Sequence, residues 1–150
     1  MNANIVIRNN TSAAQDFVFT ATMSGTATGP LTASGSIGGQ FVNGSGTLGM
    51  LTSTGPLWGA SVDGMTVNSQ LSNALFFAPP FQVVSLGNFN FSNLTVSDSI
   101  DSDVAIRFSM RLSAGGEASF TSGFSFVAVP APAALSLIAL VPVVGKRRRR

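Results

Sequence analysis

The alternation of apolar and polar residues predicts β-strands through most of this chain. The clearest run covers residues 103–112, where one set of alternate positions is apolar: Val104, Ile106, Phe108, Met110 and Leu112. Strict alternation with a period of two is the pattern of a strand that buries one face. Residues 113–116 (SAGG) predict a tight turn, and residues 117–127 predict a return strand with four apolar residues on one face: Ala118, Phe120, Phe124 and Phe126. We expect the two strands to form a hairpin.

Shorter segments repeat this pattern. Strands are expected in residues 4–9 (NIVIRN), in residues 16–23 (DFVFTATM) and in residues 86–92. In the last of these, Leu86 is expected on one face with Asn88 and Asn90, and Phe89 and Phe91 on the other. Pro79 and Pro80 interrupt residues 71–84, since proline cannot continue a central strand.

No helical periodicity precedes residue 128. The sequence therefore predicts an all-β body over residues 1–127, a single antiparallel β-sandwich that is Ig-like or jelly-roll-like, followed by one short C-terminal hydrophobic helix. Two similar hexapeptides, TATGPL (26–31) and TSTGPL (52–57), are interpreted as two similar turns. The Gly-, Ser- and Thr-rich stretch between them fits paired strands and a loop equally well.

The composition removes several classes of chemistry. The chain has no cysteine and no histidine, so it has no disulfide, no thiolate nucleophile and no imidazole base. Residues 1–145 carry three arginines and six acids, a net charge of −3, and the basic pI comes from the final five residues. Because the body lacks interleaved basic and aromatic residues, we expect no nucleic-acid partner.

The acidic residues suggest two candidate sites. Asp98, Asp101 and Asp103 lie close together in a predicted loop, which fits either a calcium site or a solvated acidic turn. Asp63 and Asp98 are a conceivable carboxylate pair for glycoside hydrolysis. No catalytic constellation emerges, so we expect a protein that is not an enzyme and has no cofactor or structural metal.

Two further features have alternative interpretations. Trp58, the single tryptophan, either stacks on a sugar ring or packs in the core. Five asparagines begin N-x-[ST] triplets, which arise readily by chance in a chain of this composition: Asn9, Asn10, Asn43, Asn90 and Asn93. The segment LSAGGEASF (112–120) resembles a strand–turn–strand of Ig-like modules in bacterial surface proteins, and residues 9–19 resemble the first hairpin of such modules.

The C-terminal 22 residues follow a different pattern. Ala133 to Gly145 is an apolar run interrupted only by Ser136 and Pro142, and Lys146 and Arg147 to Arg150 follow it. A helix of this length spans about 20 Å, short of a bilayer core of about 30 Å. A basic cluster behind an apolar segment stays in the cytoplasm, so the body is expected outside it.

This order of a proline motif, an apolar run and an arginine cluster resembles the PEP-CTERM sorting signal of Gram-negative bacteria. The motif corresponds to Val129, Pro130, Ala131 and Pro132, and Ala131 stands where the family usually has glutamate. The membrane segment corresponds to residues 133–145, with Ala133, Leu135, Leu137, Ile138, Leu140, Val141, Val143 and Val144, and the cytoplasmic stop-transfer cluster to Lys146, Arg147, Arg148, Arg149 and Arg150. The resemblance implies cleavage by an exosortase, a membrane-embedded protease, and delivery to the cell surface or matrix.

The sequence thus favours an exported, non-catalytic cell-surface or matrix protein, held first as a membrane-anchored precursor in the inner membrane of a Gram-negative bacterium. One alternative is a carbohydrate-binding module of the exopolysaccharide matrix, in which Trp58 and exposed Phe or Asn side chains contact glycan. A small hydrolase is a third. Residues 1–10 lack the basic and apolar regions of a signal peptide, so we expect an export signal to be encoded upstream of Met1.

Overall fold

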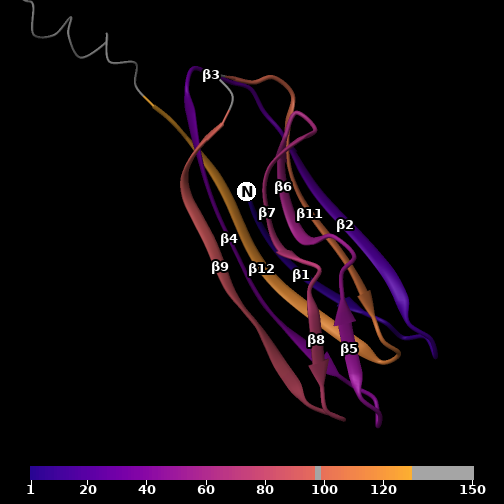
Figure 1. Ribbon diagram of the computed structural model, residues 1–150. Coiled ribbons are helices and arrows are strands. Elements are labelled where there is room, and N and C mark those ends of the chain that lie inside the picture. The colour runs from indigo at the N-terminus through magenta and orange to yellow at the C-terminus, as the bar shows by residue number, and fades with distance from the viewer. Residues whose placement is uncertain (97–98, 130–150) are drawn as a thin grey trace, which may run out of the picture.

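The chain is built of strands joined by turns, and the computed structural model describes residues 1–96 and 99–129 (Figure 1). Its twelve strands are β1 (Asn2–Arg8), β2 (Gln15–Ser24), β3 (Ala27–Thr28), β4 (Leu31–Asn43), β5 (Gly49–Thr52), β6 (Pro56–Val62), β7 (Met65–Ser72), β8 (Leu75–Ala78), β9 (Val83–Val96), β10 (Ser99–Ile100), β11 (Asp103–Leu112) and β12 (Gly116–Ala128). These ranges contain no helix. The prediction of an all-β protein is confirmed, and the predicted C-terminal helix lies outside the described residues.

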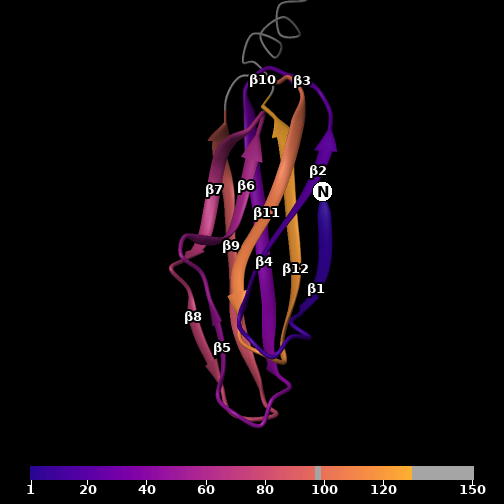
Figure 2. The same cartoon turned by 90° about the vertical axis from the view of Figure 1, so that its right-hand side faces the viewer.

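Two antiparallel sheets face each other as the layers of the molecule (Figures 1 and 2). Sheet A has four strands in the order β1-β12-β4-β9. In sheet B, β11 pairs with β2 along one side and with β6 and then β5 along the other. β7 pairs with β6, and β8 pairs with β5. A small separate pair joins β3 to β10.

The strand pairs are nested along the chain. β1 pairs with β12 and β2 with β11, while β4 pairs with β9 and β5 with β8. The chain therefore passes from sheet A to sheet B between β1 and β2 and again between β4 and β5. It returns to sheet A between β8 and β9 and between β11 and β12. At these four corners, strands that are neighbours in sequence lie in opposite layers. The two remaining crossings contain the small separate strands: β3 lies between β2 and β4, and β10 lies between β9 and β11.

The predicted hairpin of residues 103–112 and 117–127 is wrong, although both strands exist. β11 has the predicted bounds, and its five alternating apolar residues are buried. β12, however, belongs to sheet A, where it pairs with β1 and β4. The rings of Phe108 and Phe120 meet across the layers, with their centroids 5.0 Å apart. The apolar faces of the two strands cover each other as facing layers, whereas a hairpin would need another element to cover both.

A β-bulge overturns the predicted faces of β9. Gly87 has a positive φ of 85°, and the register with β4 shifts beside it, between Gly39 and Gln40. One inserted residue reverses the alternation. Leu86 is consequently buried, and Phe89 packs against the same core, while Asn88 and Asn90 are exposed. The prediction that placed Leu86 on the face of Asn88 and Asn90 is wrong.

The Gly- and Ser-rich stretch between the two hexapeptides is a strand within sheet A. β4 pairs with β12 on one side and with β9 on the other. Its glycines make room for large neighbours: a Cβ at Gly35 would lie 2.6 Å from Cε1 of Phe91. The hexapeptides contain the turns before β4 and before β6, as expected. The predicted strands near residues 4–9 and 16–23 are present as β1 and β2, and Pro79 and Pro80 separate β8 from β9.

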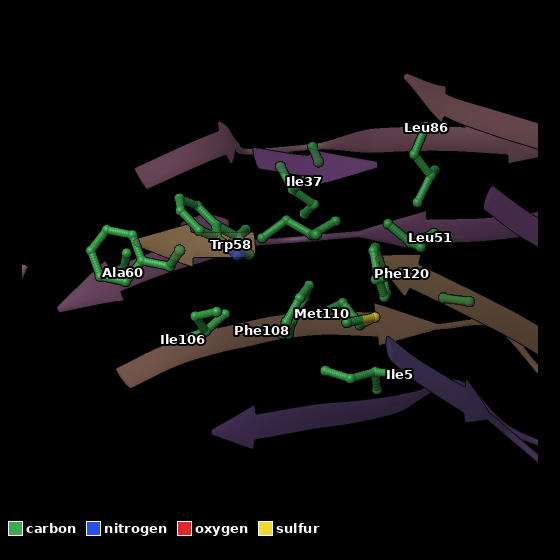
Figure 3. Packing of buried hydrophobic residues seen from close by; sticks show 14 of the residues in the cluster. Ile5, Ile37, Leu51, Trp58, Ala60, Leu86, Ile106, Phe108, Met110 and Phe120 are labelled. Carbon is green, nitrogen blue, oxygen red and sulfur yellow. The ribbon is translucent and has the colours of Figure 1, made fainter. Parts of the chain in front are cut away.

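The core lies between the two sheets and is filled mainly by aliphatic and phenylalanine side chains (Figure 3). Each sheet contributes its inward positions: Ile37 and Phe120 come from sheet A, and Phe108 and Met110 from sheet B. Full burial of such a side chain stabilises a fold by about 1.5–3 kcal/mol. The described residues therefore form one layered body around a common core.

Candidate functional site

The predicted sorting motif begins at Val129, directly after the last strand. β12 ends at Ala128, and the backbone N–H of Val129 donates a 2.8 Å hydrogen bond to the carbonyl oxygen of Pro30. Pro130, Ala131 and Pro132, the apolar run and the basic cluster lie outside the described residues, so their assignment stays a prediction. Within residues 1–96 and 99–129, no helix is long and apolar enough to cross a bilayer.

Trp58 belongs to the core, and its interpretation as a sugar-stacking residue is wrong. Its side chain is fully buried. Its Nε1–H donates a 2.8 Å hydrogen bond to Oγ of Ser122 on the facing sheet. Its ring packs against Phe91 and Phe124, with centroid separations of 6.0 and 6.4 Å. A buried tryptophan needs a partner for its polar N–H, and Ser122 supplies one, so the indole is unavailable to an external ligand.

The acidic residues are arranged around a turn. Asp63 and Gly64 form the turn between β6 and β7, and both have positive φ, as a type I′ hairpin turn requires. Oδ1 of Asp63 accepts from the backbone N–H groups of Ser102 (2.7 Å) and Asp103 (3.0 Å) and from Oγ of Ser102 (2.9 Å). Oδ2 accepts from the N–H of Asp101 (2.9 Å). The Asp63 carboxylate thus holds the loop that leads into β11.

The two carboxylate hypotheses both include Asp98, which lies outside the described residues. In the part of the chain that the structure describes, no three acidic side chains are grouped closely enough to hold a metal ion. The calcium hypothesis for Asp98, Asp101 and Asp103 and the pairing of Asp63 with Asp98 stay predictions. The structure assigns Asp63 a different role, because both of its oxygens already accept hydrogen bonds from the neighbouring loop.

This arrangement predicts a pH dependence of stability. The N–H groups of Asp101, Asp103 and Ser102 lower the pKa of Asp63 from 3.8 to about 2. Because the folded-state pKa is the lower one, the stabilisation is fully present above about pH 4 and is lost as the pH falls towards 2. Asp63→Asn is expected to lower the urea midpoint at pH 7, and the difference from the parent protein should narrow at pH 2.

The matched control is Asp16→Asn. Asp16 is also exposed, but it accepts a single hydrogen bond, from Arg111 on the neighbouring strand. Exposed ion pairs contribute little, so this variant should lose less stability at pH 7. If the urea midpoints of Asp63→Asn and the parent protein differ by the same amount at pH 7 and pH 2, the charged carboxylate does not hold the loop.

Two buried asparagines occupy equivalent corners of the fold. Asn9 follows β1, and its Nδ2 donates to the carbonyl oxygens of Ala13 (2.8 Å), Leu112 (3.0 Å) and Ser113 (3.0 Å). Its Oδ1 accepts from the N–H (3.0 Å) and the hydroxyl (2.8 Å) of Thr11. One side chain therefore ties the corner between β1 and β2 to the corner between β11 and β12. We call Asn9 and its counterpart Asn43 the asparagine clamps.

Asn43 repeats the arrangement at the end of β4. Its Nδ2 donates to the carbonyl oxygens of Thr47 (2.7 Å), Ala78 (3.0 Å) and Pro79 (3.0 Å). Its Oδ1 accepts from the N–H (3.0 Å) and the hydroxyl (2.8 Å) of Ser45. The second clamp ties the corner between β4 and β5 to the corner between β8 and β9.

The clamps explain two of the five N-x-[ST] triplets. In both, the residue two positions on caps the asparagine oxygen, which is the chemistry of an Asx turn. Asn9 and Asn43 are at most 1% exposed, and their amide nitrogens are already bonded. The sequence carries a signal for them, an asparagine at a strand end followed by Thr or Ser at the second position, but it does not show that the amide is buried.

The outward side of sheet A carries a hollow of about 600 Å³, which all four strands line. The strand register places the outward residues of this part of the sheet in rows. We call the residues of these rows the amide face: Asn2, Gly123, Ser36 and Asn90; Asn4, Thr121, Gly38 and Asn88; Val6, Ser119, Gln40 and Ser85. The face was not predicted, because it needs the pairing of four segments that are distant in sequence.

Glycines form part of the floor of the amide face. A Cβ at Gly38 would overlap Oδ1 of Asn88, and a Cβ at Gly123 would lie 3.1 Å from Oδ1 of Asn2. The asparagines of the two outer strands thus lean over glycines of the two inner strands. Arg8 and Glu117 lie beside the face and pair with each other, with Nε donating to Oε2 at 2.6 Å. The face itself carries no charged side chain.

No family model, no curated protein and no solved structure matches this chain. The predicted sorting motif, the asparagine clamps, the Asp63 turn and the amide face are therefore the features from which a function is inferred.

Proposed function

We propose that this chain is an exported, non-catalytic protein of the cell surface or extracellular matrix, sorted by its C-terminus. One observation carries the proposal: the order of VPAPAA, an apolar run and KRRRR in the last 22 residues. The apolar run inserts into the inner membrane, and the arginines hold its end in the cytoplasm. An exosortase-type membrane protease then cuts near the proline motif and releases the body.

The position of the last strand supports this proposal. β12 lies between β1 and β4 in sheet A, so the body needs it for stability. It ends at Ala128, and Val129 still bonds to Pro30. A cut between Val129 and Ala133 would remove no residue of the twelve strands that the structure describes. The released body would keep both sheets and the core.

The order of the strands favours the jelly-roll alternative for the body. Each sheet is four strand positions wide, if β5 and β6 are counted as one position of sheet B and β7 and β8 as another. We infer a jelly roll because the chain forms four nested strand pairs that alternate between these two sheets. In an Ig-like sandwich, successive strands would more often be neighbours in one sheet.

The proposal is tested by expressing an epitope-tagged full chain, with an export signal, in hosts with and without an exosortase. We expect a C-terminally shortened product only in the host that has the protease. The variant with Pro130→Ala and Pro132→Ala should stay uncut, whereas Pro142→Ala, which changes a proline outside the motif, should still be cut. Identical full-length products in both hosts would overturn the proposal.

A second function has an observation of its own. In the carbohydrate-binding alternative, Trp58 cannot contact the glycan, because it is buried. The amide face is the candidate binding surface instead, since its exposed asparagines surround a hollow of about 600 Å³. The inference below develops this second function.

A further inference from the structure

We infer that the amide face binds an uncharged polysaccharide, which lies across the four strands of sheet A. The inference rests on the second function above and adds the surface and the class of glycan. It does not depend on how the C-terminus is sorted.

The first argument is charge. The twelve positions of the amide face include asparagine, glutamine, serine, threonine, glycine and one valine, and no acid or base. The nearest charged side chains on sheet A, Arg8 and Glu117, pair with each other. The side chains of the face thus offer no ionic attraction to an acidic polymer, and an uncharged ligand buries no charge there.

The second argument is unused hydrogen-bonding capacity. Among the described residues, Oγ of Ser85 accepts a hydrogen bond from the N–H of Gly87 (3.2 Å), and the other polar side chains of the face make no hydrogen bond with the protein: Asn2, Asn4, Ser36, Gln40, Ser119, Thr121, Asn88 and Asn90. Each amide offers both donors and an acceptor, and each hydroxyl can do either. Sugar hydroxyls likewise donate and accept hydrogen bonds, so a polyol matches these donors and acceptors better than a ligand that only accepts hydrogen bonds.

The third argument is shape. Neighbouring strands lie about 4.8 Å apart, so the four strands give a face about 14 Å wide. Gly38 and Gly123 carry no side chain of their own, and Asn88 of β9 and Asn2 of β1 lean over them, so no bulky side chain fills the face there. The hollow is therefore a shallow, open trough, which suits a segment of a chain and not a small enclosed ligand. Strand addition needs a free edge of a sheet, and the amide face lies between the edges that β1 and β9 form, so the face itself cannot bind a peptide by adding a strand.

The test is affinity electrophoresis of the full chain in a detergent without a sugar headgroup. The gels contain dextran, β-1,3-glucan or mannan as uncharged probes, and alginate as an acidic probe. We expect at least one uncharged probe to retard the protein and alginate to have no effect. The double variant Asn4→Ala/Asn88→Ala removes two amides and should weaken binding about 10-fold or more.

A second variant and a matched control make the result specific. Gly38→Gln fills the centre of the trough and should abolish retardation. Asn10→Ala/Gln15→Ala removes two exposed amides that are not on the face, and it should bind like the parent. Urea unfolding of all variants shows whether they are folded. Retardation that the face variants leave unchanged, retardation by alginate alone, or no retardation in any gel would overturn the inference, while C-terminal processing would be unaffected by either outcome.

Discussion

Replacing Trp58 with alanine is expected to lower the free energy of unfolding by about 4 kcal/mol, because the change empties a large volume in a fully buried site. The indole packs against Phe91 and Phe124, so the cavity would lie between the two sheets. The substitution also leaves the hydroxyl of Ser122 without its partner. Urea unfolding monitored by far-UV circular dichroism measures the loss.

Two further variants separate the contribution of the Trp58 ring to stability from that of its N–H group. Trp58→Phe keeps an aromatic ring and removes the donor, and Ser122→Ala removes the acceptor; each should cost about 1–3 kcal/mol. Because Trp58 is the single tryptophan, the parent protein should also show the blue-shifted fluorescence of a buried indole. A loss below about 1 kcal/mol for Trp58→Ala, with red-shifted fluorescence of the parent, would place the indole at the surface.

Asn9→Ala and Asn43→Ala are each expected to cost about 3 kcal/mol, because each removes a buried amide whose two N–H donors are shared among three carbonyl oxygens and whose oxygen accepts two hydrogen bonds. The carbonyl groups of the opposite corner would lose their donor, and water cannot fully replace a side chain that is at most 1% exposed. The loss should appear as a lower urea midpoint with an unchanged slope.

The control for the asparagine clamps is Asn10→Ala. Asn10 is the neighbour of Asn9 and also begins an N-x-[ST] triplet, but it is exposed, so its replacement should change stability by less than about 0.5 kcal/mol. Asn43→Asp keeps the shape and the acceptor but loses the N–H donors, so it should be nearly as damaging as alanine. Equal effects of Asn9→Ala and Asn10→Ala would contradict the clamp.

The fold class was predictable because it depends on local alternation. Residues 103–112 form β11 with the predicted bounds and the predicted buried face. Partner choice was not predictable in the same way. A strand with one apolar face can pair with any similar strand, and the short turn at residues 113–116 suggested a hairpin where the structure has a corner between layers.

Local irregularities limited the assignment of faces. The bulge at Gly87 reverses the alternation in β9, and a glycine alone does not show whether a strand bulges or continues. The same limit applied to β4, whose glycines suggested a loop as readily as a strand. They are accommodated there because large neighbours such as Phe91 occupy the space above them.

The site residues were predictable only where the signal is local. The sequence allowed two interpretations of Trp58, and its burial in the structure shows that it is a core residue. The asparagine clamps are visible as triplets, but their partners Leu112 and Ala78 are distant in sequence. The amide face requires the register of four strands, which only the assembled sheet supplies. The proposed sorting signal differs from these, because its three parts are contiguous and its pattern is visible in the sequence without knowledge of the fold.

The most direct test of the central claim is the intact mass of the protein recovered from outside cells that carry an exosortase. The account predicts a released body whose C-terminus lies between Val129 and Ala133, lacking the apolar run and all five basic residues. Recovery of the chain only inside the cell, still ending in Arg150 and outside the membrane fraction, would contradict it.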